Sequence, residues 1–165
     1  NEILNMVDHK INLKFQDVIL PIYTSKHRIG LTLMDGPYCS ILPKGKSSSQ
    51  SILSNVKHSV IAESSTRLGL KTINYSKIII DEHVASIYKE SAYYFPFLKD
   101  EVNHNYNWRT VKALPINSND ARVSEIFHHP NLPNFLTILS GKVTTCWKIA
   151  FEINAIINNE KGFII

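Results

Sequence analysis

The feature that most constrains this fold is a series of short apolar runs in the first 61 residues, rich in β-branched side chains and separated by polar or turn-forming residues. Runs of this length and composition are typical of β-strands. The run before Asp35-Gly36-Pro37 closes on a strong turn signal, because glycine tolerates positive φ and proline fixes its own φ. The predicted strands, which together indicate an antiparallel meander, cover residues 11–23, 29–34, 38–42 and 51–61.

Helical spacing replaces this pattern farther along the chain. Apolar residues recur with a helical period over 80–95, after a candidate N-cap at Ser76 and before Pro96, which ends the run. A second amphipathic helix, beginning just after Gly141, is predicted over 143–158. Extended patterns cover 103–114, 124–128 and 135–139. A sheet combined with helices predicts an α+β fold.

Composition and charge limit the functional classes. The 165 residues are 44% hydrophobic and 19% charged, which is typical of a globular domain with a core. The net charge is +4, but the lysines and arginines are scattered, so we predict no nucleic-acid partner. No apolar run reaches the roughly 18–20 residues of a membrane span. Cys39 and Cys146 form no disulfide framework and follow apolar patterns, which predicts buried, inert thiols and a cytoplasmic location.

Other chemistry-bearing residues give weaker indications. His128 and His129 are adjacent and therefore point to opposite faces of a strand, and His104 has no acidic or cysteine partner at ligand spacing. We therefore predict no metal site, and we assign no catalytic residue because no triad or carboxylate pair is apparent. Tyr38, Tyr93, Tyr94 and Trp108 are candidates for the wall of a pocket, although aromatic residues at such spacing more often belong to a core.

The most informative segment is a predicted strand, a glycine turn and a predicted helix over 134–150. A helix N-terminus exposes unpaired N–H groups and the positive end of the helix dipole, so it suits an anionic or electron-rich ligand edge. Gly141 allows close approach to the backbone, and Lys142 adds a positive charge. The alternative is an ordinary strand–helix connection with a solvated lysine.

Three motifs carry a resemblance to a known family. The run Ser140-Gly141-Lys142-Val143-Thr144-Thr145, followed by Trp147-Lys148-Ile149-Ala150, resembles the Gly-Gly-Lys-Leu-Thr-Thr segment near the end of FAD-dependent glycerol-3-phosphate dehydrogenases, and related D-amino-acid-oxidase superfamily members have a similar strand, glycine and helix there. Met34-Asp35-Gly36-Pro37-Tyr38 resembles a Met-Asp-Gly-Pro-Phe segment of bacterial members. Trp108-Arg109-Thr110 and Asn119-Asp120-Ala121-Arg122-Val123 resemble the region before the family's last strand, with Thr110 and Val123 where proline is usual. The matches follow the family's order.

The resemblance implies the C-terminal part of an FAD-dependent oxidoreductase that oxidises a C–H bond next to an amine or hydroxyl of a small anionic substrate. It implies a partial substrate-binding domain over 1–130, and over 131–165 the final strand and helix of a truncated FAD-binding domain. The implied flavin-edge residues are Ser140, Gly141, Lys142, Val143 and Thr144, and the implied substrate ligands are Arg109 and Tyr38.

No GxGxxG fingerprint for the FAD pyrophosphate occurs in the chain. Together with the absence of an initiator methionine, this leads us to expect that the N-terminal FAD-binding half is missing. The alternative function is a non-enzymatic α+β binding domain that uses its sheet for a protein partner or a ligand.

Overall fold

The computed structural model describes residues 11–34, 38–46, 49–116, 124–129, 131–139 and 141–158. These residues form antiparallel sheets and helices, which confirms the predicted α+β class. The chain divides into two compact units, one over 14–113 and the other over 1–13 with 114–165. The expected turn at 35–37 and the site candidate Ser140 lie outside the described residues.

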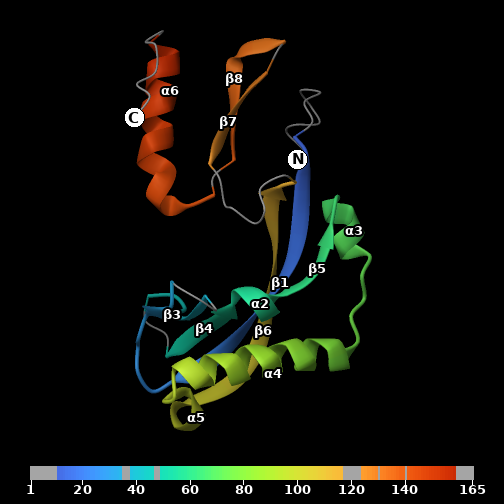
Figure 1. The fold of residues 1–165 in the computed structure, drawn as a ribbon, viewed down its shortest axis with the longest axis vertical. Helices are drawn as coiled ribbons and strands as arrows, with labels where there is room; N and C mark the ends of the chain where they lie inside the picture. Colours follow the sequence, from blue (N-terminus) through green and yellow to red (C-terminus); the bar gives the residue numbers. More distant parts are fainter. Residues whose placement is uncertain are drawn as a thin grey trace. The chain divides into compact units, whose positions relative to one another are not determined.

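The larger unit is built on a sheet with the strand order β2-β3-β4-β1-β5, in which β6 also pairs with β1. Figure 1 shows helix α4 (Lys77–Tyr94) beside β3 and β4. The strands are β1 (Leu13–Ser25), β2 (Leu31–Thr32), β3 (Cys39–Pro43), β4 (Gln50–Asn55), β5 (Val60–Ser64) and β6 (Val102–Pro115). The expected strands at 11–23, 38–42 and 103–114 are therefore confirmed within two residues, whereas the one expected at 29–34 shrinks to two residues.

The single strand predicted over 51–61 is wrong, because helix α2 (Val56–Ser59) divides it into β4 and β5. Both pieces pair with β1, β4 through Ile22–Thr24 and β5 through Phe15–Val18. The four residues of helix α2 connect these two pairings, which lie at different positions along β1. Asn55 starts it, because its side chain accepts hydrogen bonds from the backbone N–H groups of Lys57 and His58 at 2.9 and 3.1 Å.

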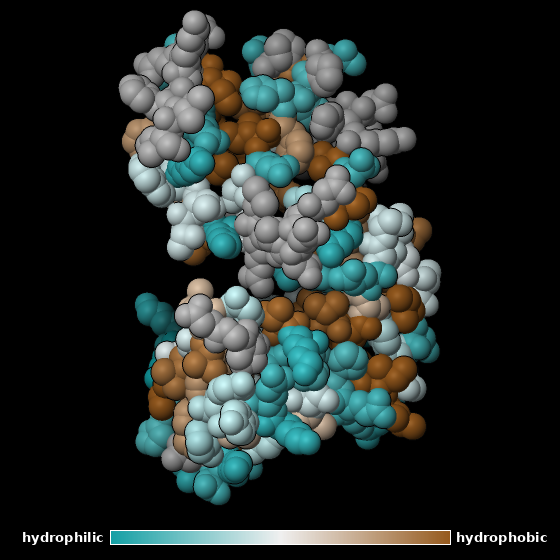
Figure 2. All heavy atoms as spheres, in the orientation of Figure 1, coloured by the Kyte–Doolittle hydropathy of each residue, from teal (hydrophilic) through white to brown (hydrophobic). Residues whose placement is uncertain are grey.

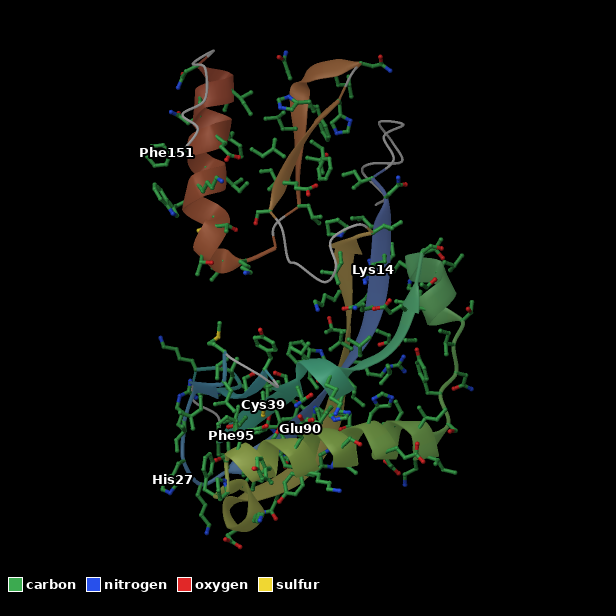
Figure 3. The ribbon with its side chains drawn as sticks, viewed as in Figure 1. Lys14, His27, Cys39, Glu90, Phe95 and Phe151 are labelled. Carbon is green, nitrogen blue, oxygen red and sulfur yellow. The ribbon has the colours of Figure 1, made fainter. Side chains whose placement is uncertain are left out.

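The core of this unit lies between the sheet and α4 (Lys77–Tyr94), which confirms the predicted helix and its N-cap at Ser76. Figure 3 shows Cys39 and Phe95 close together in this region. The Cys39 thiol donates to the Ser91 hydroxyl of α4 at 3.0 Å, and burial raises the pKa of that thiol. The buried core residues come from β1, β3, β4, α4 and the segment after α4: Ile19, Tyr23, Cys39, Ile41, Leu53, Ile87, Ala92, Phe95 and Leu98.

Two short helices extend the unit, and neither was predicted. Helix α3 (Arg67–Lys71) starts at Thr66, whose hydroxyl accepts from the backbone N–H of Gly69 at 3.0 Å. Helix α5 (Leu98–Glu101) follows Pro96, and Leu98 is buried in the core. Each is too short for the helical period of apolar residues to be visible in the sequence.

The smaller unit contains a hairpin of β7 (Glu125–His129) and β8 (Leu132–Leu139), the short 3-10 helix η1 (Val143–Thr145) and helix α6 (Cys146–Ile157). The predicted strands are confirmed within three residues, and the helix predicted over 143–158 starts as the 3-10 turn η1 and continues as α6. Strand β7 pairs with β8 and falls in the same compact unit as α6. The domain boundary expected at residue 130 would place β7 in the first domain instead. Figure 2 shows apolar atoms between α6 and the hairpin.

Candidate functional site

The turn between β8 and α6 is fixed by a chain of hydrogen bonds through Ser124. The Gly141 N–H donates to the Ser124 hydroxyl oxygen at 3.0 Å, and the Thr145 hydroxyl donates to the Lys142 carbonyl at 2.8 Å. The two hydroxyl oxygens are 2.5 Å apart. Since Thr145 has already used its only hydroxyl proton, Ser124 donates to Thr145. This Ser124 hydrogen-bond chain holds both ends of the turn in place.

The start of α6 presents positive charge to solvent. Val143 is 84% exposed, and within the described part of the chain the N–H groups of Val143 and Thr144 have no hydrogen-bond acceptor. The Lys142 side chain is exposed, and no acidic residue lies in the first turn of α6. Backbone donors, a helix dipole and an ammonium group therefore act together on one side of Gly141.

A hollow of about 480 Å³ lies beside this turn and shares Ser124 with it. Its polar lining includes the carboxylates of Glu125 and Glu152 and the imidazole of His128, and its apolar lining comes from Ile126, Ala155 and Ile156. Carboxylates favour a cationic group and oppose an anion, so this hollow does not suit the small anionic substrate that the resemblance implies.

Arg109, the expected substrate ligand, lies on β6 and forms an ion pair with Asp17 of β1. The Asp17 side chain is only 5% exposed, whereas that of Arg109 is 44% exposed. The Arg109 guanidinium carbon also lies 4.8 Å from the centre of the Tyr75 ring. One edge of the guanidinium is thus held by protein, while its other donors can reach a ligand.

The Tyr75 hydroxyl is buried beside this ion pair. Burial raises the pKa of Tyr75, and the negative charge of Asp17 raises it further. Although Asp17 is close enough to act on the hydroxyl, the hydroxyl has no hydrogen-bond partner with acceptable geometry among the described residues. A buried Asp17 and a stacked Tyr75 give the Arg109 side chain a defined position.

Tyr38, the second expected substrate ligand, has a φ of 46°, in the left-handed region that residues other than glycine rarely adopt. Its side chain is 51% exposed. Strands β4 and β1 separate it from Arg109, which corresponds to about 14 Å across the sheet. The two residues therefore do not form one compact site on the sheet.

The remaining candidate residues differ in how far they are buried. Cys146 is exposed, so the prediction of a buried thiol is correct for Cys39 and wrong for Cys146. Tyr93 and Trp108 are 77% and 46% exposed, so neither belongs to the core. His129 is buried and contacts Thr137 at 2.9 Å.

The described residues contain neither a metal-binding group nor a membrane-spanning helix. Within the described residues, no three histidine, cysteine or acidic side chains are grouped so as to hold a metal ion. No helix in those same ranges is long and apolar enough to cross a membrane.

Ser124, Asp17 and Tyr75 are the residues of these sites that the sequence did not reveal. Each lies at least 17 residues from its partner along the chain, so no local spacing signals the contact. Comparison of the chain with protein-family models, curated proteins and solved structures finds no match.

Proposed function

We propose that this chain is the C-terminal part of an FAD-dependent oxidoreductase that oxidises a C–H bond next to an amine or hydroxyl of a small anionic substrate, such as an amino acid, a hydroxy acid or a polyol phosphate. The observation that carries the proposal is the turn between β8 and α6. It combines the motif that resembles the D-amino-acid-oxidase superfamily with exposed N–H donors, a helix start and the Lys142 ammonium group.

The donor set fits an electron-rich heterocycle edge. The N–H groups of Val143 and Thr144 and the charge of Lys142 stabilise negative charge, and Gly141 removes the Cβ that would hinder approach. The Ser124 hydrogen-bond chain keeps these donors fixed, so no reorganisation is needed when charge develops. When bound, FAD supplies the hydride acceptor.

Arg109 is proposed to bind the anionic group of the substrate. A guanidinium presents donors in a planar fork that matches two oxygens of a carboxylate or phosphate. Asp17 and Tyr75 occupy one edge and one face of that fork, which orients it and leaves the remaining donors for the ligand. Because Tyr38 lies about 14 Å from Arg109 across the sheet, a small substrate held by Arg109 does not also contact Tyr38, and we propose no role for Tyr38 at this site.

The proposal is tested in the full-length protein with Lys142→Met and a matched control, Lys148→Met. Lys148 is also exposed on α6, but it pairs with Glu152 at 3.8 Å, away from the turn. Losing a charge-assisted hydrogen bond of about 1.5–3 kcal/mol slows flavin reduction roughly ten- to a hundredfold in Lys142→Met. Stopped-flow flavin reduction measures this rate, and equal rates for both variants contradict the assigned role.

The substrate side is tested separately with Arg109→Lys, which keeps the charge but loses the fork. We expect weaker apparent substrate binding with a nearly unchanged limiting reduction rate. An unchanged dependence of the rate on substrate concentration contradicts the role of Arg109 without affecting that of Lys142.

Extending the reading frame upstream distinguishes the oxidoreductase from the alternative binding domain. A strand followed by GxGxxG, roughly 150–250 residues before Asn1, supports the oxidoreductase. A start codon immediately before Asn1 supports a small binding domain.

A further inference from the structure

Strand β6 is an edge strand with large exposed side chains. It pairs with β1, and among the described strands it has no second partner. Most of its 14 residues are exposed, including Tyr106 at 42% and Trp108 at 46%. Monomeric domains tolerate single exposed apolar side chains, but two neighbouring exposed aromatic rings on one strand are a feature of binding surfaces.

Over 106–112 the side chains of β6 alternate between two faces, after a break in the alternation where His104 packs against Tyr23 and Asn105 bonds to Thr24. Lys112 donates to the Gln16 side chain at 3.1 Å, whereas Arg109 pairs with Asp17, the next residue of β1. Tyr106, Trp108, Thr110 and Lys112 therefore share one face, called here the aromatic face of β6. The Arg109 guanidinium belongs to the other face.

A cation lies near each end of the aromatic face. The Lys44 ammonium contacts the Tyr106 hydroxyl and lies 4.9 Å from the centre of its ring, while Lys112 lies four residues beyond Trp108. Within the described part of the chain, Trp108 makes no ring contact and its indole N–H has no protein acceptor. Its ring surface and its N–H are thus available to a ligand.

The spacing of the two rings defines the shape of that ligand. Side chains two residues apart on a strand are about 6.6–7 Å apart, which is roughly twice the contact distance between stacked carbon atoms. One planar ring therefore fits between Tyr106 and Trp108, or lies over either of them. The ammonium groups of Lys44 and Lys112 and the net charge of +4 add preference for an anion.

We propose that the aromatic face of β6 binds a planar aromatic ring that carries an anionic group, such as an aromatic carboxylate or a nucleotide. The site does not depend on the proposed flavin chemistry, because it is a surface of this chain alone. An oxidoreductase function can fail while this binding holds, and binding can fail while the flavin-edge role of Lys142 holds.

Isothermal titration calorimetry of the 165-residue chain with three probes tests the proposal. The planar anion 2-naphthoate is expected to bind with a dissociation constant of about 1 mM or below. Cyclohexanecarboxylate has the same charge but no planar ring, and it is expected to bind at least about tenfold more weakly. AMP distinguishes the two sources: tighter binding than 2-naphthoate indicates a nucleotide, and weaker binding indicates an aromatic acid.

Matched variants locate the binding. Trp108→Leu removes the indole from the face, and Trp147→Leu makes the same change at the other tryptophan, which is 60% exposed on α6. Trp108→Leu is expected to weaken 2-naphthoate binding about tenfold or more, whereas Trp147→Leu leaves it unchanged. Tyr106→Leu, with a smaller expected loss, serves as a second variant if Trp108→Leu does not fold by circular dichroism.

Three results of the binding measurements overturn the proposal. They are the absence of saturable binding of both 2-naphthoate and AMP up to about 10 mM, equal affinity for 2-naphthoate and cyclohexanecarboxylate, and wild-type affinity in folded Trp108→Leu or Tyr106→Leu. The indole N–H signal of Trp108 in the Trp147→Leu chain gives an independent reading by NMR. It shifts on addition of 2-naphthoate if the ring binds at this face, and an unmoved signal overturns the assignment of the site.

Discussion

The ion pair between Asp17 and Arg109 predicts an asymmetry between two single substitutions. Arg109→Met removes the cation but keeps most of the side chain's bulk, and it leaves the carboxylate of Asp17, only 5% exposed, without its cation. Asp17→Asn keeps the shape of the partner, and the guanidinium left behind is 44% exposed and can be hydrated. Removing the exposed partner is therefore expected to cost more stability than removing the buried one.

The expected loss of stability for each substitution follows from how far the two side chains are buried. Breaking a buried ion pair by removing one partner costs about 3–5 kcal/mol. Because Arg109 is nearly half exposed, solvent screening lowers this to about 2–3 kcal/mol for Arg109→Met, including the loss of the contact with the Tyr75 ring. Asp17→Asn keeps an acceptor oxygen for Arg109 but replaces a charge-assisted hydrogen bond by a neutral one, so it is expected to cost about 1 kcal/mol. In the Asp17→Asn background, Arg109→Met costs under about 1 kcal/mol, so the coupling energy is about 1–2 kcal/mol.

Urea unfolding of the four chains measures these free energies. A Trp147→Phe background leaves Trp108, which neighbours Arg109, as the only tryptophan and reports the unfolding of the larger unit by fluorescence. Midpoints are compared only where the urea dependence of the unfolding free energy is unchanged. An Arg109→Met cost no greater than that of Asp17→Asn, or a coupling energy below about 0.3 kcal/mol, refutes the reasoning from burial.

Three further predictions concern other parts of the chain. Burial, followed by the charge of Tyr88, raises the pKa of Tyr23 from 10.0 to about 12, so its contribution to stability is present below pH 10 and is lost as the pH rises toward 12. We expect the free energy of unfolding, measured in urea, to fall over this pH range by about 2–3 kcal/mol more in wild type than in Tyr23→Phe. Ser124→Ala removes the two hydrogen bonds that Ser124 makes with Gly141 and Thr145, and it is expected to destabilise the smaller unit by about 1–3 kcal/mol. Increased amide exchange at Gly141 measures this loss, and Ser124→Thr is the control that retains the hydroxyl. Asn55→Ala removes the N-cap of α2 and is expected to cost about 1–2 kcal/mol in thermal unfolding, whereas Asn55→Ser retains most of the stability; equal losses contradict the capping role.

Local chemistry explains why much of the fold could be predicted. Ser76 caps α4, and the helical period after it is long enough to be recognised in the sequence. Strands β1 and β6 are long enough to show their extended pattern, and Gly141 separates the final strand from the helix. The division of the segment 51–61 was missed because it depends on two separate pairings with β1, and Asn55 is compatible with a strand end as well as a helix cap.

The class of fold and the passage from strand through the Gly141–Lys142 turn to helix can be read from the amino-acid sequence, because they depend on neighbouring residues. The hydroxyl that holds that turn, the carboxylate that holds Arg109 and the cysteine that is exposed become known only in the folded chain. Contacts such as Ser124 with Gly141, or Asp17 with Arg109, join residues that are 17 and 92 positions apart. Strand pairing and packing set these contacts, and neither is encoded in the spacing of residues along the chain.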